Sequence, residues 1–337
     1  MNERKINGWK GILCILLGTA LLAAFAHGRI GTLRGLALSQ RAAERYAGQS
    51  GRRFVQLSAF FPPGDAVSEF NILLFNAALE DGLRSSGNRG TGTGSGFAFS
   101  YSASARLPVQ SARGTFPLAA LGTGGDFFLF HPYTLLSGSL MELPAGNGII
   151  LNDRAAWTLF GAVDVVGQPV VIGGGAYVVS GVVCLEEDPA SREALEGETG
   201  MVFVPFALMK TGVTCYEVVL PEPVAGYGES LFAGLRTGNT VTNTGRFSPS
   251  AIRKAILALP AYNMTVYSAP VPYWENAARN IEMRLILWTM LLNFILLPGA
   301  AVSFFLLIMP MAERVLRFRK NGRRIPVNAG RKGVTDP

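Results

Sequence analysis

The sequence predicts a mixed α+β domain carried on two transmembrane helices. Two uncharged apolar segments lie near the two ends of the 337-residue chain. The hydrophobic content of 49% and the mean hydropathy of +0.30 are high for a soluble protein. Between the apolar segments, helical and strand patterns alternate without an internal repeat, which is typical of an α+β fold.

The first apolar segment, GILCILLGTALLAAFA, spans residues 11–26 and follows a short basic start. We assign residues 1–10 to a cytoplasmic N-terminus and residues 11–27 to a transmembrane helix or an uncleaved signal anchor. A basic start, a short apolar run and the small residues Ala24 and Ala26 also fit a cleavable signal peptide. The sequence leaves open whether this segment is cleaved.

A helical stalk at residues 28–50 and a core domain at residues 51–272 are expected to follow. The strand and first helix of this domain are expected within residues 54–79, and the helix pattern extends from Ala66 to Leu83. The apolar face of that helix carries Phe70, Leu73, Leu74, Ala77 and Ala78. A strand at Phe97 to Leu107 and its expected partner at Thr115 to Leu121 come next.

The most informative stretch, residues 149–183, combines four structural signals without a gap. We predict a strand at Ile149 to Leu151 and then a helix that is capped by Asn152 or Asp153 and ended by Gly161. A hairpin of two strands, Val170 to Ile172 and Tyr177 to Val183, follows. Three glycines, Gly173 to Gly175, join the hairpin strands because glycine adopts positive φ at low cost.

The last part of the chain predicts a helix, a strand and the second span. Ser248 and Pro249 start a helix whose buried face is expected to carry Ile252, Ala255, Ile256 and Leu259. A strand is expected at Met264 to Ser268. Residues 273–309 are expected to be helical, and their last 25 residues, 285–309, carry no charge and can cross a membrane.

The charge distribution predicts the orientation in the membrane. The net charge is +7, of which residues 1–10 contribute +2 and the tail after Pro310 contributes +6. By the positive-inside rule, both termini, including the basic tail at residues 310–337, are cytoplasmic and residues 28–283 face outward. The remaining chain is close to neutral, which argues against nucleic acid as a partner and favours anionic membrane lipid.

Polar and small residues in the second span predict helix packing. Asn293 is the strongly polar side chain there, and Gly299 with Ser303 forms a small-xxx-small pair. These three residues are expected either to pack against the first span or to form a homo- or hetero-oligomer contact.

The cysteines leave a disulfide open. Cys184 and Cys215 are both placed outside the membrane on predicted strands. They either form a bridge in an oxidising compartment or remain two buried thiols. Cys14 lies in the first apolar segment, and no C-x-x-C pair supports a redox or zinc role.

No catalytic, cofactor-binding or metal-binding residue is predicted, and we expect the chain not to be an enzyme. The glycine-rich residues 90–97 lack the Gly-Lys-Ser/Thr of a phosphate loop and favour a surface hairpin. The only histidines are His27 at the membrane edge and His131, which we expect to be a packed residue. An acidic loop, which lacks the spacing of a calcium site, carries Glu186, Glu187, Asp188, Glu193, Glu196 and Glu198. The Asn263-Met264-Thr265 glycosylation motif is treated as accidental.

The block at residues 149–183 resembles the extracytoplasmic periplasmic core domain of MacB-type ABC transporter permeases, in the MacB/FtsX family. The resemblance lies in ILND, AAWTLFG, DVVGQPVVI and AYVVSGVV, with flanking agreement at residues 125–138 (GDFFLFHPYTLLSG) and 201–205 (MVFVP). It covers roughly residues 50–270. The family has further spans and an ATPase, neither of which is expected in this chain, so the resemblance is to a truncated two-span form.

The resemblance implies a bacterial inner-membrane protein. Two alternative functions are expected for such a protein. The first is a non-enzymatic component of an ABC-type export or mechanotransmission system, which relays conformational change or handles substrate with separate ABC ATPase and permease chains. The alternative is a two-span binding or sensory module whose external domain binds a peptide, envelope component or neighbouring protein. The sequence does not identify a substrate, and fold analogy alone does not fix function.

Overall fold

The computed structural model describes residues 3–85, 96–140, 146–184, 189–195, 200–233, 239–258 and 271–322. The chain forms two compact units. One unit contains the residues up to Gly31 together with those from Leu287 onward, and the other extends from Thr32 to Ile286. We call the first the helical unit and the second the α+β domain.

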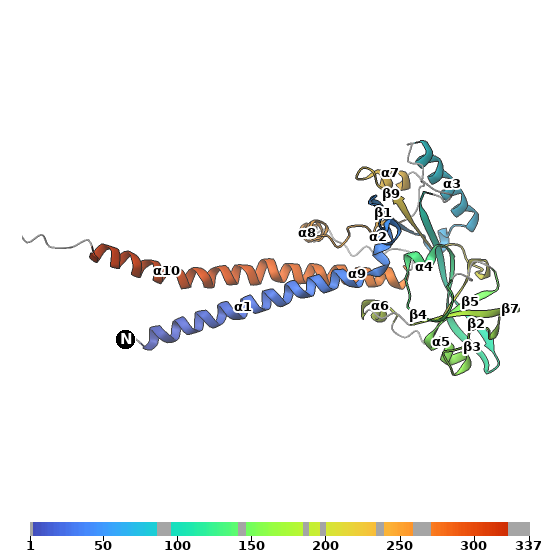
Figure 1. Ribbon diagram of the computed structural model, residues 1–337, viewed down its shortest axis with the longest axis horizontal. Coiled ribbons are helices and arrows are strands. Elements are labelled where there is room, and N and C mark those ends of the chain that lie inside the picture. Colours follow the sequence, from blue (N-terminus) through green and yellow to red (C-terminus); the bar gives the residue numbers. More distant parts are fainter. Residues whose placement is uncertain are drawn as a thin grey trace, which may run out of the picture. The chain divides into compact units, whose positions relative to one another are not determined.

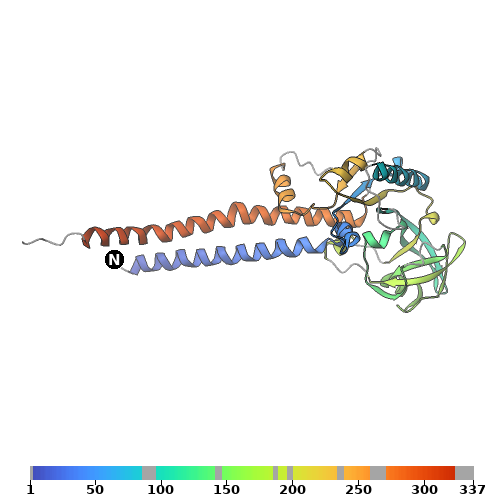
Figure 2. The same ribbon diagram turned by 45° about the horizontal axis from the view of Figure 1, so that its top comes forward.

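The helical unit is built from two long apolar helices. Helix α1 is Glu3–Leu36, and a π-helical turn, η6 (Leu291–Leu296), leads into α10 (Leu297–Gly322). The segments Leu13–Leu36 and Tyr273–Leu306 are long and apolar enough to cross a membrane. Both views show α1 and α10 running side by side (Figures 1 and 2).

A ten-stranded mixed sheet forms the centre of the α+β domain, in the order β10-β1-β9-β2-β3-β8-β5-β7-β4, with β6 pairing with β2 and β7. Its strands are β1 (Phe54–Phe60), β2 (Ala98–Ser111), β3 (Gly114–Gly125), β4 (Leu135–Gly138), β5 (Gly148–Asn152), β6 (Pro169–Ile172), β7 (Gly175–Val183), β8 (Met201–Pro205), β9 (Cys215–Pro221) and β10 (Asn239–Thr242). The pairs β3–β8 and β5–β7 are parallel, whereas the other pairs are antiparallel. The mixed α+β class predicted from the sequence is therefore confirmed.

The remaining helices and helical turns belong wholly or mostly to this domain. They are η1 (Leu38–Arg41), α2 (Ala42–Ala47), η2 (Pro63–Asp65), α3 (Glu69–Ser85), α4 (Phe127–Phe130), α5 (Asp153–Phe160), α6 (Pro189–Ala194), η4 (Phe206–Leu208), α7 (Tyr227–Ala233), α8 (Pro249–Leu257) and α9 (Tyr273–Met290). The main core lies between the sheet and α3, α5 and α7, where Ile72, Leu159 and Phe232 are buried. Figure 1 shows α3 and α7 at the β9 end of the sheet and α5 near β3 and β5.

The predicted elements at residues 149–183 are confirmed. Asn152 caps α5, because its side chain accepts a hydrogen bond from the Ala155 backbone N–H at 2.8 Å. Gly161 ends the helix in the left-handed conformation with φ 77°. Gly173 and Gly174 also have positive φ and join β6 to β7. The predicted pairing of Phe97–Leu107 with Thr115–Leu121 corresponds to β2 and β3.

Helix α3 contradicts the sequence expectation about its buried face. The face predicted to be apolar is exposed, with Phe70 and Leu73 at 65% and 58% exposure. The face that packs on the core instead contains Ile72, Asn76, Leu79 and Leu83. Asn76 belongs there because the buried Tyr216 hydroxyl donates to its Oδ1 at 2.7 Å. One polar residue on the buried face thus obscured the helical pattern.

Two further expectations are corrected or only partly met. The helical stalk predicted at residues 28–50 is not one helix, because α1 ends at Leu36 and η1 and α2 follow separately. Ala42 and Ala43 of α2 are buried in a small apolar cluster. Helix α8 begins where Ser248 and Pro249 predicted it, but Ile252 is the only residue buried among those described on its face.

Several predicted features lie outside the described residues. They are most of the glycine-rich segment 90–97, the acidic residues Glu186, Glu187, Asp188, Glu196 and Glu198, the glycosylation motif with the strand at 264–268, Leu259, and the basic tail from residue 323 onward.

Candidate functional site

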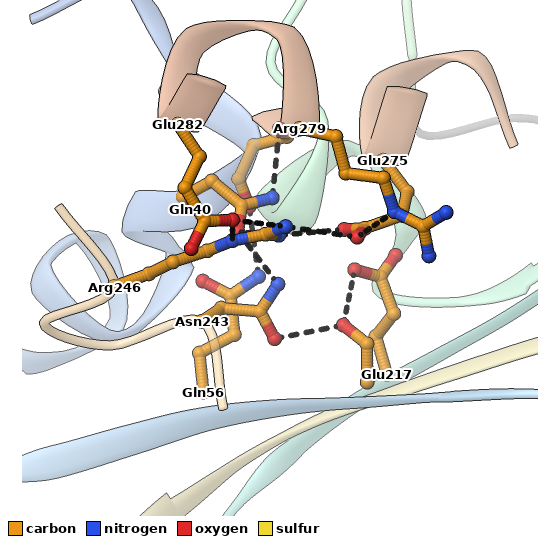
Figure 3. A network of polar contacts seen from close by, with 10 residues as sticks. Gln40, Gln56, Glu217, Asn243, Arg246, Glu275, Arg279 and Glu282 are labelled. Atoms are coloured by element: carbon orange, nitrogen blue, oxygen red, sulfur yellow. Dashed lines mark hydrogen bonds and ion pairs between the residues drawn. The ribbon is translucent and has the colours of Figure 1, made fainter. Parts of the chain in front are cut away.

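A buried polar network is the most distinctive feature of the α+β domain (Figure 3). It joins η1, strands β1 and β9, the loop between β10 and α8, and helix α9. Its location matters because η1 follows α1 in the chain and α9 continues into η6 and α10. The network therefore involves both chain segments that lead to the apolar helices.

Arg246 is at the centre of the charged part of the network. Its side chain is 10% exposed, and its guanidinium contacts both oxygens of Glu275 at 2.8 and 3.1 Å. It also donates to Glu282 at 3.0 Å, about two helical turns further along α9 than Glu275. Arg279 donates to Glu275 at 3.0 Å from the next turn of the same helix. Two arginines thus balance two glutamates.

The charge balance keeps Arg246 ionised despite its burial. Burial alone would lower the pKa of Arg246, but the charges and hydrogen bonds of Glu275 and then Glu282 outweigh it and raise the pKa. Such an arrangement adds little net stability relative to an apolar core, whereas removal of one partner costs about 3–5 kcal/mol. The cluster therefore fixes the position of α9 more than it adds to overall stability.

Amide side chains connect the charged cluster to η1 and β1. Asn243 donates to Gln40 of η1 at 2.8 Å, and Arg246 follows Asn243 in the same loop. Gln56 of β1 accepts from the Ala42 backbone N–H at 2.8 Å and donates to the Ser39 carbonyl at 2.7 Å. Because Gln56 is fully buried, these bonds satisfy an amide that water cannot reach.

A buried acid and a buried histidine extend the network to the other side of β1. Ser58 Oγ lies 2.9 Å from Asn243 Oδ1 and 3.1 Å from Glu217 Oε1. The second oxygen of Glu217 is 2.5 Å from His131 Nε2, and both side chains are 2% exposed. The His131 ring packs on Trp274 of α9, with 4.1 Å between centroids. Glu217 thereby connects β9 to α9 through His131.

The arrangement is suited to mechanical coupling. Its polar groups contact one another across five segments of the chain, so a displacement of α9 must break or shift several hydrogen bonds together. Among the described residues, no group of three or more histidine, cysteine, aspartate and glutamate side chains could hold a metal ion. We therefore treat the network as a candidate coupling site.

The structure places the other sequence candidates as follows. His131 is buried, as expected for a packed residue, but its pairing with Glu217 was not foreseen. No disulfide joins Cys184 and Cys215, and of the two thiols expected to be buried in that case only Cys215 is buried, whereas Cys184 is partly exposed. Glu193 of the predicted acidic loop pairs with Arg284 of α9.

The three polar and small residues of the second span differ in their surroundings. Ser303 is buried, and a Cβ added at Gly299 would lie 3.8 Å from Thr19 of α1. Gly299 is therefore in van der Waals reach of the first span. Asn293 is instead exposed within the π-helical turn η6.

Some signals for this network are present in the sequence. Glu275, Arg279 and Glu282 share one helical face just before an uncharged span, which predicts charge pairing at a defined surface. Glu217 interrupts the apolar strand CYEVVLP and predicts a buried partner. Asn243 and Arg246 gave no such signal, because they lie in an irregular loop.

The two long apolar helices and the α+β domain that separates them in the sequence suggest a membrane protein with a folded domain outside the bilayer. Residues 85–244 match the family described as the MacB-like periplasmic core domain. The chain therefore contains a MacB-like extracytoplasmic core domain, as the sequence resemblance predicted. The matched region includes His131, Glu217 and Asn243, whereas Gln40 and the α9 residues lie outside it.

Three solved structures are similar to this chain. The periplasmic region of MacB from Actinobacillus actinomycetemcomitans has 12% identity and a TM-score of 0.38, over 64% of this chain and 98% of its own. The extracellular domain of the noncanonic ABC-type transporter YknZ from Gram-positive bacteria has 15% identity and a TM-score of 0.37. The match covers 56% of this chain and 99% of the YknZ domain. A domain of a putative permease protein from Porphyromonas gingivalis has 12% identity and a TM-score of 0.32. The match covers 64% of this chain and 87% of that domain. No curated protein matches the sequence.

Proposed function

We propose that this chain is a non-enzymatic component of an ABC-type export or mechanotransmission system, and that its external domain relays conformational change to the membrane helices. The observation that carries the proposal is the buried polar network centred on Arg246. It involves η1, which follows one apolar helix, and α9, which continues into the other.

The helix α9 is suited to a relay. A helix transmits an axial displacement because its backbone hydrogen bonds hold each turn to the next. Three of its charged side chains, Glu275, Arg279 and Glu282, belong to the network. A shift of the sheet is therefore expected to reach α9 through Arg246 and through the contact of His131 with Trp274.

The proposed orientation places both termini in the cytoplasm. The basic residues at the N-terminus and after Pro310 support it through the positive-inside rule. In this orientation the basic tail is available to a cytoplasmic ATPase, and the family match to a MacB-like periplasmic domain supports such a partner. Separate ABC ATPase and permease chains are the proposed partners.

A second candidate function is a membrane-anchored binding or sensory module. The observation that favours it is a cavity of about 600 Å³ in the α+β domain, a size common in small-molecule sites. In this case the chain is expected to be stable without an ATPase partner.

Affinity purification of the full chain from its native membrane tests the proposal. We expect an ABC ATPase to co-purify in stoichiometric amount with the intact chain, and to be lost when residues 311–337 are deleted. The loss is expected because the deletion removes eight basic residues from the proposed cytoplasmic surface.

A matched control replaces the same tail with a neutral Gly/Ser segment of equal length. Charge-dependent binding predicts loss of the ATPase in this variant as well. Purification of the intact chain without any ATPase would contradict the proposed function and favour the sensory module.

A further inference from the structure

Asn293 is a strongly polar side chain inside the uncharged stretch of the second span. It follows Leu285, the first residue of that stretch, by eight residues, which corresponds to about 12 Å of helix. Its side chain is exposed, and its amide has no hydrogen-bond partner within the described part of the chain. An amide that faces hydrocarbon without a partner is costly. The amide therefore needs a partner from another molecule.

The backbone around Asn293 is irregular. Leu291–Leu296 form the π-helical turn η6, and the Leu297 backbone N–H donates to the Leu292 carbonyl, five residues back. Turns of this kind are rare and occur frequently at functional sites. The backbone and the exposed amide are separate observations, and both single out the same point of the span.

The contact with the first span uses another face of this helix. Leu296 and Ser303 are buried, and a Cβ added at Gly299 would lie 3.8 Å from Thr19 of α1. Since each residue advances by about 100° around the helix axis, these residues share one stripe, and Leu297 lies about a quarter of a turn away from it. Packing against α1 therefore leaves the Asn293 side uncovered.

Apolar side chains continue the Asn293 face along α10. Leu297 and Phe304 are 50% and 56% exposed, and Ala300 lies between them with partial exposure. Positions 293, 297, 300 and 304 are spaced by four, three and four residues, which is the spacing of a seam between two helices. The small side chain of Ala300 permits close approach of a second backbone. We call these four residues the seam.

The amide favours a second copy of this chain as the partner. A side-chain amide has both donors and acceptors, so two amides at the same depth can satisfy each other. A twofold axis joins the same surface of two copies and thus places the two Asn293 side chains opposite each other. A second copy therefore supplies a matching group at the required depth.

We propose that the seam joins two copies of this chain within the membrane. The two Asn293 amides hydrogen bond to each other, and Leu297, Ala300 and Phe304 pack against their counterparts in the second copy. This contact goes beyond the relay function and does not depend on it, since the seam shares no side chain with the polar network.

Sedimentation equilibrium of the full chain in density-matched detergent micelles tests the contact. We expect a monomer–dimer equilibrium for the wild type, weakened by about fivefold or more in Asn293→Leu, because the interhelical hydrogen bonds are lost. Asn293→Gln keeps the amide and is expected to retain most of the association. The matched control Val302→Leu changes a 59% exposed residue outside the seam and is expected to leave the dimer unchanged.

Disulfide cross-linking in native membranes locates the contact. Ala300→Cys and Val302→Cys are compared in a full chain that also carries Cys14→Ser and Cys184→Ser, whereas Cys215 is buried. A disulfide requires Cα atoms within about 7 Å, so we expect a cross-linked dimer for Ala300→Cys and none for Val302→Cys.

Three results would overturn the proposal. They are a wild-type chain that is monomeric at every concentration, dimerisation of Asn293→Leu equal to that of wild type, and equal cross-linking from positions 300 and 302. Cross-linking of Ala300→Cys to a different chain alone would also overturn it and assign the seam to a separate membrane protein. The readout is association of copies, so failure here leaves the proposed relay function standing.

Discussion

At the residue scale, burial determines what the ionisable side chains of the domain can do. Glu217, His131 and Arg246 are buried with partners, whereas Cys215 is buried as a neutral thiol. Glu217 could be predicted as a buried acid, because it interrupts an apolar strand. Its partner His131 could not, because the two residues are 86 positions apart and meet only after α4 is placed against β9.

Cys215 yields a prediction about thiol reactivity. Burial, and then the nearby charge of Glu217, raise the pKa of its thiol well above the ordinary value. Only the thiolate reacts, so we expect Cys215 to remain unlabelled by iodoacetamide between about pH 7 and about pH 9 in the folded chain. Cys184 is partly exposed and is expected to be alkylated. Peptide mass spectrometry measures both.

Denaturant provides the control for this labelling. We expect Cys215 to react fully once the chain is unfolded. Labelling of native Cys215 at the same rate as Cys184, or a peptide in which the two are disulfide-linked, would contradict the structure.

At the element scale, local signals were predictable and tertiary ones were not. The cap at Asn152, the stop at Gly161 and the turn at Gly173 and Gly174 depend on neighbouring residues, so the sequence predicted them correctly. The buried face of α3 depends on Tyr216, which is 140 positions from Asn76. That distant hydroxyl decides the orientation of the helix, and no local pattern reports it.

The cap of α5 gives a prediction about stability. Asn152 Oδ1 accepts from the buried backbone N–H groups of both Ala155 and Met201, at 2.8 and 3.0 Å. Asn152→Ala is therefore expected to lower the free energy of unfolding by about 2–3 kcal/mol, because two buried donors lose their acceptor. Thermal or denaturant unfolding of the purified full chain measures the loss.

Ser248→Ala is the matched cap variant. Ser248 Oγ accepts from one backbone N–H, that of Ala251, in a partly buried position of α8, and its other contact is with the exposed Ser250 hydroxyl, so its loss is expected to cost about 1 kcal/mol. An equal or smaller effect of Asn152→Ala would show that the link from α5 to β8 does not stabilise the domain.

At the scale of the whole molecule, the sheet order places residues from distant parts of the sequence together. Strand β1 lies between β9 and β10, which follow it by more than a hundred residues. This order brings Gln56 and Ser58 beside Glu217 and Asn243. Sequence periodicity predicts which residues are buried, but it does not predict strand order, so the network remained hidden.

Helix α4 contributes to both the cavity of about 600 Å³ and the polar network. Its Phe127 and Phe128 line the cavity, while Phe127 also meets Trp274 of α9 edge-on at 5.8 Å between centroids. His131, at the end of α4, joins the polar network. The cavity and the polar network are therefore neighbours in the α+β domain, although neither was predicted from the sequence.

In the proposed relay, Arg246 couples α9 and η1 to the sheet. Hydrogen–deuterium exchange of the full chain in nanodiscs tests it most directly, by comparison of wild type with Arg246→Met and with the control Arg253→Met, an exposed arginine of α8. Loss of Arg246 removes the ion-pair partner of Glu282 and leaves Glu275 with Arg279 alone, at a cost of about 3–5 kcal/mol.

We predict faster exchange in Arg246→Met throughout the first three turns of α9 and around Gln40 to Ala43, with α5 unchanged and the Arg253→Met pattern equal to wild type. Faster exchange confined to the loop around Arg246, with α9 and η1 unaffected, would contradict the proposed coupling of α9 and η1 to the sheet through this network.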